Sequence, residues 1–443
     1  MATHPISGPK RTVRRKKLVL GVLAIASATA IGLSGCTSGG SGAAAPDPNK
    51  KITLSFWGSV PNEAKSVAIW NKAHPNIHVD LHQETGDDGS KVPAAVDAGT
   101  GPDIAQVSQH SLPDYVINKR AINIAPYIKN TKNLYTPAAW SSVQFGDAIY
   151  GVPQDSGPAG LLYRTDIFKK YGLTPPATWD DYVADAQKLH AANPSIYLGQ
   201  FSPAEFGMYY QTMVQAGGSW YGISGNSWKV SVNDAGNQKV AALWQGLLDQ
   251  KLLKVVQMWT PEYWKDVDSG QIASISYAAW FPQLLKQNAA KLSGKWAVAP
   301  EPTFAGSTAG GESGGAAMVV LKGTKYPKQA AEFSSWFDSN KASVDILVSQ
   351  GGLFPAAKIG LQSPTLDQAD PYFGGEKVFS VFKAAALISP DTAQNGPGFD
   401  KLTSDLADQF GKVASGSETF AQALDSVQAS TVANLKSQGL SVK

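Results

Sequence analysis

The chain has a single cysteine, Cys36, among its 443 residues, so the fold uses neither disulfide bonds nor thiolate metal sites. Its N-terminal apolar run, residues 18–33, is diluted with Gly and Ala and falls short of the roughly 20 residues that span a bilayer. Beyond residue 35 there is no basic run and no basic-aromatic motif, which argues against a nucleic-acid partner. We expect no cofactor and no bound metal.

The one cysteine stands at an informative place. Residues 10–17 are basic, residues 18–33 are apolar, and the run ends in Leu33-Ser34-Gly35-Cys36. This pattern is typical of a cleaved export signal and predicts a signal peptide over residues 1–35 and a flexible linker over residues 36–50. Its resemblance to bacterial lipoproteins implies a diacylglyceryl thioether (palmitate-type acyl chains) on Cys36, anchoring the protein to the outer face of the cell membrane. The Arg14-Arg15 pair leaves the choice between the general and the twin-arginine export route open.

Removal of residues 1–35 takes away six Lys/Arg and no Asp/Glu, which turns the formal net charge from +3 to −3. The basic character of the chain therefore belongs to the signal peptide. The remaining residues exceed what one hydrophobic core usually serves, so two lobes are expected. Twelve Trp is a generous number for a soluble chain, and several stand beside Gly or Pro in expected loops, where rings often face clefts.

Residues 52–57 and 77–82 are predicted to form strands, with a helix between them that ends at residue 73. A helix over residues 92–98 and a strand over residues 104–107 repeat this unit. The repetition favours a mostly parallel, doubly wound sheet.

A second α/β stretch follows from residue 161, with helices predicted over 179–191, 238–248 and 262–269 and a strand over 272–277. Residues 150–158 interrupt the pattern, and residues 295–302 are extended and proline-rich; both are interpreted as crossings between lobes that form a hinge. A strand over 316–321 and two helices over 399–410 and 419–435 complete the chain. The predicted N-lobe comprises residues 51–155 and 304–350, and the C-lobe residues 156–303 and 351–443.

In their order, eight motifs behind the signal peptide resemble one family, the extracellular solute-binding proteins of ABC importers, of the maltose- and oligosaccharide-binding type (family 1). They are residues 52–58, Gly101-Pro102-Asp103-Ile104, Tyr150-Gly151-Val152-Pro153, Leu162-Tyr163-Arg164-Thr165-Asp166, Thr178-Trp179-Asp180-Asp181, Gly217-Gly218-Ser219-Trp220, Gly270-Gln271-Ile272-Ala273 and Gly314-Gly315. The resemblance implies an α/β, two-lobe periplasmic-binding-protein-like fold (type II) whose discontinuous lobes are joined by hinge strands. It also implies a monomeric, non-enzymatic receptor that binds a carbohydrate between its lobes and delivers it to the transmembrane permease of an importer with a separate ATPase.

A sugar needs an aromatic ring against its C–H face and polar groups for its hydroxyls. The expected stacking residues are Trp57, Trp220 and Trp280, although core packing is an equal alternative for each. The resemblance implies that Asp155 and Glu312 supply carboxylates and that Gln109 and His110 add polar contacts. His110 could instead cap a helix that begins at Ser111.

Three other interpretations compete with the receptor. Gly311-Glu312-Ser313-Gly314-Gly315 fits the Gly-x-Ser-x-Gly pattern of a serine hydrolase, but that fold needs a histidine after the serine, and the last histidine is His190. A lipid-anchored glycoside hydrolase needs only two carboxylates, which spacing cannot exclude. His78, Asp80 and His82 share one strand face that could hold a metal ion or could simply be solvated.

Overall fold

The computed structural model describes residues 50–84, 91–390 and 395–443. All of them belong to one compact unit that begins at Asn49. The predictions for the signal peptide and for Cys36 lie outside the described residues. Within the described ranges, none of the helices combines the length and the apolar character that a membrane crossing requires.

The first sheet has five strands in the order β2 (Ile77–Gln83), β1 (Ile52–Gly58), β3 (Ile104–Ser108), β14 (Ala316–Val320) and β6 (Val152–Pro153). Strand β1 runs parallel to β2 and β3, as the repeated strand–helix–strand pattern predicts. Strand β14 is antiparallel to both of its neighbours. The expectation of a mostly parallel sheet therefore holds only for the three strands that helices connect in sequence, because β14 returns to the sheet from a distant part of the chain.

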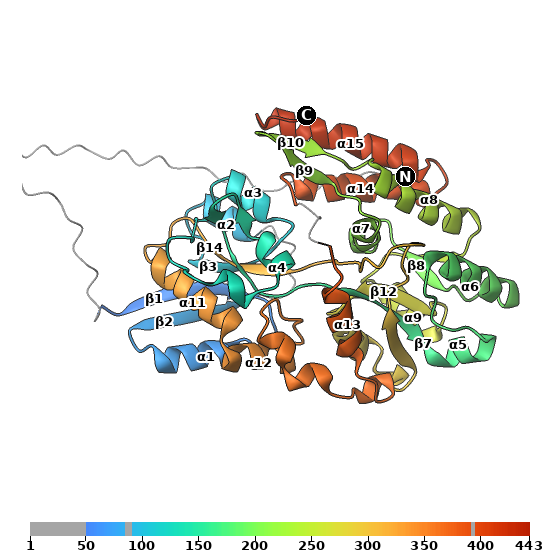
Figure 1. Cartoon of the computed structure of the whole chain (residues 1–443), viewed down its shortest axis with the longest axis horizontal. Coiled ribbons are helices and arrows are strands. Elements are labelled where there is room, and N and C mark those ends of the chain that lie inside the picture. Colours follow the sequence, from blue (N-terminus) through green and yellow to red (C-terminus); the bar gives the residue numbers. More distant parts are fainter. Residues whose placement is uncertain (1–49, 85–90, 391–394) are drawn as a thin grey trace, which may run out of the picture. The chain divides into compact units, whose positions relative to one another are not determined.

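Four helices accompany this sheet: α1 (Ala64–Ala73), α2 (Lys91–Asp97), α11 (Pro327–Ser339) and α12 (Lys341–Ser349). Helices α1 and α12 lie side by side (Figure 1). Short α3 (Leu112–Ile117) follows β3, and α4 (Pro137–Ser141) precedes the β4 (Gln144–Phe145) and β5 (Ala148–Ile149) hairpin.

The second sheet has three antiparallel strands in the order β12 (Ser274–Ala278), β7 (Ala159–Arg164) and β13 (Trp296–Pro300). Strand β13 thus occupies most of the segment that was interpreted as a crossing. The chain crosses after it, because Trp296–Pro300 already pairs along its length with β7. Two small sheets join β8 (Gly199–Phe201) to β11 (Leu253–Val255) in parallel, and β9 (Tyr221–Ser224) to β10 (Ser227–Val230) as a hairpin.

The helices of this part are α5 (Thr165–Tyr171), α6 (Trp179–Ala192), α7 (Phe206–Gln215), α8 (Ala235–Asp249), α9 (Pro261–Ser269), α10 (Phe281–Asn288), α13 (Val378–Ala386), α14 (Phe399–Ala414) and α15 (Phe420–Ser437). Helices α14 and α15 lie side by side near the C-terminus (Figure 1). Both α6 and α15 begin with a capping box, at Thr178 and Thr419, which satisfies backbone N–H groups of the first turn. Short 3₁₀ turns, η1 to η5, fill several connections.

Two main hydrophobic clusters form the interior. One draws on residues 52–152 and 317–357, and the other on residues 161–304 and 354–435. Each contains one of the two larger sheets. The lobe boundaries given above stay a prediction.

Candidate functional site

Two crossing segments, residues 154–158 and 301–315, connect the first sheet with the second. They lie side by side: the N–H of Ser313 donates to the carbonyl of Gly157 at 2.8 Å, and the N–H of Ala159 donates to the carbonyl of Gly311 at 2.9 Å. A Cβ atom at Gly157 would stand only 1.8 Å from the Ser313 carbonyl oxygen. This close approach therefore requires glycine at position 157.

Asp155 fastens the first crossing to strand β14. Its Oδ1 accepts a hydrogen bond from the Ala316 N–H at 2.6 Å, and its backbone bridges to Pro355. Burial raises the pKa of the Asp155 carboxyl to about 7, against the lowering effect of the backbone hydrogen bonds. The half-buried side chain stands at the crossing where the sequence predicted it. Its contact with a ligand stays a prediction.

Gln109 holds the glycine-rich end of the second crossing. Its side-chain Nε2 donates to the Gly314 carbonyl, and its backbone N–H donates to the Gly315 carbonyl at 3.0 Å. Gly315 has a φ of +116°, and a Cβ there would lie 2.7 Å from the Gln109 amide. The segment is therefore shaped around this side chain.

The buried carboxylate of Glu301 anchors the start of the same crossing, a residue that the sequence analysis did not single out. Its Oε1 accepts from Gln211 Nε2 and Ser276 Oγ, each at 2.7 Å, and its Oε2 accepts from the Gly311 N–H at 3.1 Å. Burial raises the pKa of Glu301 to about 7 even though these bonds favour the charged form. The only sequence signal was a glutamate between two prolines in an extended stretch.

Trp280 brings an aromatic ring of the second sheet to this crossing. The residue precedes α10 and is half-buried, and its ring centroid lies 4.9 Å from that of Tyr277 and 5.9 Å from that of Trp259. A Cβ built on Gly314 would stand 3.2 Å from the indole Nε1 of Trp280. Trp280 and Gln109 thus approach Gly314 from different sheets. Trp259, 39% exposed, is a second aromatic beside them that sequence reasoning missed.

Glu312 and Trp57 complete the partly accessible candidates. Glu312 is half-buried within the second crossing, pairs through its backbone with Pro158, and adds to the effect of burial in raising the pKa of Tyr210. Trp57 is half-buried at the end of β1, with its ring centroid 5.5 Å from that of His82. The structure gathers Gln109, Asp155, Trp280 and Glu312 around the crossings.

Trp220 and His110 lie within a buried aromatic cluster. Trp220 is 2% exposed, with its ring centroid 4.9 Å from that of Tyr210. His110 is 3% exposed; its Nδ1 lies 2.9 Å from Asn395 Oδ1, and burial lowers its pKa to about 4. Neighbours of Trp220 come from α7 and α14, so packing leaves it no open ring face for a sugar. The His110 side chain does not cap helix α3 either, because it contacts Asn395 and the N-cap residue is Ser111.

Ser313 lacks the setting of a hydrolase nucleophile. The serine is 4% exposed, and the segment that contains it leads into strand β14, whereas a nucleophile elbow turns from a strand into a helix. The proposed metal face on β2 is exposed at His78, Asp80 and His82. Among the residues that the structure describes, no group of three or more His, Cys, Asp or Glu is arranged to hold a metal ion.

Comparison with known proteins decides the family. Residues 50–344 match the family model for the bacterial extracellular solute-binding proteins. The chain belongs to this family. The resemblance inferred from the eight motifs is confirmed, and so is the α/β two-lobe fold class.

Two solved structures are similar over most of their length. The galacto-N-biose-/lacto-N-biose I-binding protein of the ABC transporter from Bifidobacterium longum is 31% identical, with 90% of this chain and all of that chain covered and a TM-score of 0.81. The ABC transporter associated binding protein from B. animalis subsp. lactis, in complex with β-1,6-galactobiose, is 28% identical, with 89% and 100% covered and a TM-score of 0.77.

Curated relatives include two proteins named for the sugars they bind. The arabinooligosaccharide-binding protein of Bacillus subtilis is 23% identical over 84% of each chain. The lactose-binding protein of Rhizobium radiobacter is 27% identical over 53% of this chain. That alignment spans 56% of the lactose-binding protein's length.

Proposed function

We propose that this chain is a receptor that binds a carbohydrate at the crossing segments and delivers it to the permease of an ABC importer. The observation that carries the proposal is the Trp280 ring beside Gly314, next to Gln109, Asp155 and Glu312. An indole face suits the C–H face of a sugar ring, and carboxylates and amides suit its hydroxyls. The four relatives described above are all binding proteins, which favours a receptor over the hydrolase alternatives.

The crossings suit a hinge. A ligand that contacts residues of both sheets favours the closed arrangement by its difference in affinity for the two arrangements, and the permease then recognises the closed form. In this proposal Trp57 and Gln109 contribute from the first sheet, Trp280 from the second, and Asp155 and Glu312 from the crossings. We leave Trp220 and His110 out of the site, because their side chains are buried in the aromatic cluster.

We also propose that acylated Cys36 anchors the mature, monomeric protein to the outer face of the cell membrane. The support is the basic and apolar stretch that ends at this cysteine, together with membership of an extracellular family. Cys36→Ala should release the protein into the medium. Retention of residues 1–35 in the mature protein, seen by mass spectrometry, contradicts the proposal.

A thermal-shift and calorimetric screen tests the receptor function. The probes are lacto-N-biose, β-1,6-galactobiose, lactose and arabino-oligosaccharides of two to four units. A bound ligand raises the melting temperature by mass action, and recovery of the sugar unchanged excludes hydrolysis. If none of these probes shifts the melting temperature at millimolar concentration, the carbohydrate assignment fails.

A further inference from the structure

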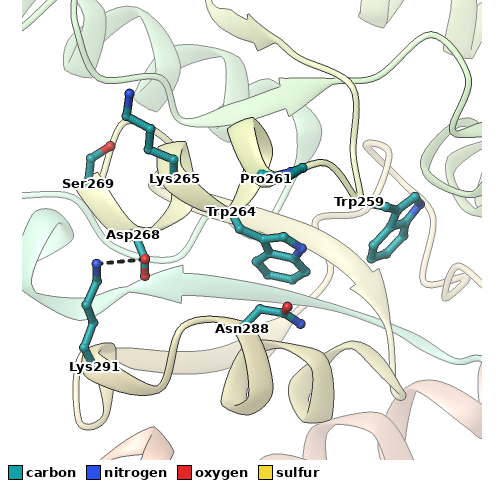
Figure 2. A pocket seen from close by; sticks show the side chains of 8 residues that line it. All are labelled: Trp259, Pro261, Trp264, Lys265, Asp268, Ser269, Asn288 and Lys291. Carbon is teal, nitrogen blue, oxygen red and sulfur yellow. Dashed lines mark ion pairs between the residues drawn. The ribbon is translucent and has the colours of Figure 1, made fainter.

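A hollow of about 670 Å³ lies beside helices α9 and α10, and both Trp259 and Trp264 line it. Figure 2 shows its lining: the two indoles of Trp259 and Trp264 at one side and charged side chains at the other. Its volume falls within the range of small-molecule sites. We call it the α9 hollow. It does not include any of the residues predicted as ligand contacts from the sequence.

Trp259 is held in a fixed and unfavourable conformation. Its φ is +70°, a left-handed value that is rare for a bulky side chain, and the residue is nevertheless 39% exposed. The indole Nε1 donates to Glu205 Oε2 at 2.6 Å, and the other oxygen of Glu205 accepts from the Tyr277 hydroxyl at 2.8 Å. Backbone strain of this kind persists where the surroundings enforce it, commonly at ligand sites. The structure therefore presents a rigid aromatic surface to solvent.

Trp259 also connects the α9 hollow with the candidate site. Its ring centroid is 5.9 Å from that of Trp280 and 6.5 Å from that of Trp264. These spacings are close to the length of one sugar unit in an oligosaccharide. The three indoles form a continuous aromatic row that begins beside Gly314 and ends in the hollow.

The remaining lining supplies hydrogen-bonding groups of both kinds. Lys291 Nζ and Asp268 Oδ2 form an ion pair at 2.8 Å, so their charges offset each other, and Lys265 and Asn288 are exposed nearby. The Trp264 indole stands over the Asn288 side chain (Figure 2). Ammonium and amide donors next to carboxylate and amide acceptors suit hydroxyl groups, which both donate and accept.

We propose that the α9 hollow is an additional subsite, which holds the outer sugar unit of an oligosaccharide whose inner units bind at Trp280. This inference rests on the proposed function. It predicts that the protein prefers chains longer than a disaccharide, with Trp259 stacking between the two positions and Trp264 and Asn288 contacting the outer unit.

Chain-length dependence tests the proposal. Calorimetry compares the β-1,6-linked galacto-oligosaccharides and the arabino-oligosaccharides of two, three and four units on the protein and on its Trp264→Ala and Asn288→Ala variants. One stacked ring contributes on the order of 1 kcal/mol, so affinity should rise roughly fivefold or more with the added unit, and both variants should lose this gain. Gln287→Ala is the matched control, because Gln287 is the exposed neighbour of Asn288 on α10 and does not line the hollow.

The outcomes separate the two hypotheses. If no sugar binds, the proposed function fails and the subsite fails with it. If sugars bind with an affinity independent of length, or if the gain survives in Asn288→Ala and in folded Trp264→Ala, the subsite alone is overturned. The subsite is also overturned if both variants bind the disaccharide and the tetrasaccharide more weakly by the same factor, since the hollow would then belong to the primary site. Melts without ligand identify any variant that fails to fold.

Discussion

The imidazole of His110 is stacked on the phenyl ring of Phe399, with 4.9 Å between the ring centroids and 8° between the planes. His110 follows β3 of the first sheet, whereas Phe399 begins α14 in the second hydrophobic cluster. Asp114 reinforces the contact, because its carboxylate accepts the N–H groups of Gly398 and Phe399 at 2.8 and 3.3 Å. These contacts join the first-sheet loop to the C-terminal helices.

His110 should make folding stability depend on pH. Burial lowers its pKa from 6.5 to about 4, so between these values the unfolded chain binds more protons than the folded one. The contribution of His110 is therefore complete above pH 6.5 and is lost as the pH falls toward 4. It amounts to roughly 3 kcal/mol, since one pKa unit corresponds to about 1.36 kcal/mol. Urea unfolding of the protein and of His110→Phe at several pH values measures the difference.

The exposed histidine of β2 supplies the control for this prediction. His78→Phe is that control, because it replaces a histidine on the solvent face of β2 and leaves His110 in place. If the free energy of unfolding of His110→Phe depends on pH between 4 and 6.5 as strongly as that of the unaltered protein, His110 does not titrate as its burial implies.

Glu301 should act in the opposite direction. Its pKa is raised from 4.5 to about 7, so the folded chain holds the proton more firmly in this range and the contribution of Glu301 to stability falls as the pH rises through it. Glu301→Gln should remove this component. The free energy of unfolding of the variant, measured relative to that of the unaltered protein, should therefore be higher at pH 8 than at pH 5. The pKa of Asp155 is also raised to about 7, so the variant should keep part of the dependence of stability on pH. Glu262→Gln, at an exposed position of α9, is the control. If the free energy of unfolding depends on pH equally in both variants, the prediction is contradicted.

Gly157→Ala should disturb the paired crossings. The added methyl group would meet the Ser313 carbonyl oxygen at 1.8 Å, so the two segments must separate, and overpacking of this kind costs typically about 1–3 kcal/mol. Gly246→Ala is a matched comparison within α8, where an added Cβ has no neighbour within 4 Å. Because alanine favours helix, that variant should gain up to about 1 kcal/mol. Chemical denaturation of both variants tests the contrast, and equal effects would exclude a special role for Gly157.

The sequence predicted the local elements well, because they depend on local patterns. The strands predicted over residues 52–57 and 77–82 correspond to β1 and β2, and the helices predicted over 179–191 and 419–435 correspond to α6 and α15. The direction of β14 was not predictable in this way. It depends on where a strand more than 200 residues after β3 re-enters the sheet.

The burial of individual aromatic residues could not be read from the sequence either. Trp220 stands beside glycines, as an accessible ring does, but residues from α7 and α14 enclose it. Conversely, Trp259 is 39% exposed, with its indole held by Glu205 and its backbone in the left-handed region. Both outcomes depend on contacts between residues far apart in the chain. Local composition carries no information about such contacts.

A pair of tryptophan substitutions separates site from core. Trp280→Ala should weaken sugar binding by roughly 1–2 kcal/mol, because a half-buried ring beside the crossing offers a face for stacking. Trp220→Ala should instead lower the free energy of unfolding by about 3–5 kcal/mol, because its ring fills the aromatic cluster and a cavity remains. Melts with and without the bound sugar measure both quantities on the same samples. Trp228→Ala, a half-buried ring on β10 away from the crossings, controls for the loss of any large aromatic. A large loss of stability in ligand-free Trp280→Ala, with affinity preserved in its folded fraction, would move Trp280 from the site to the core.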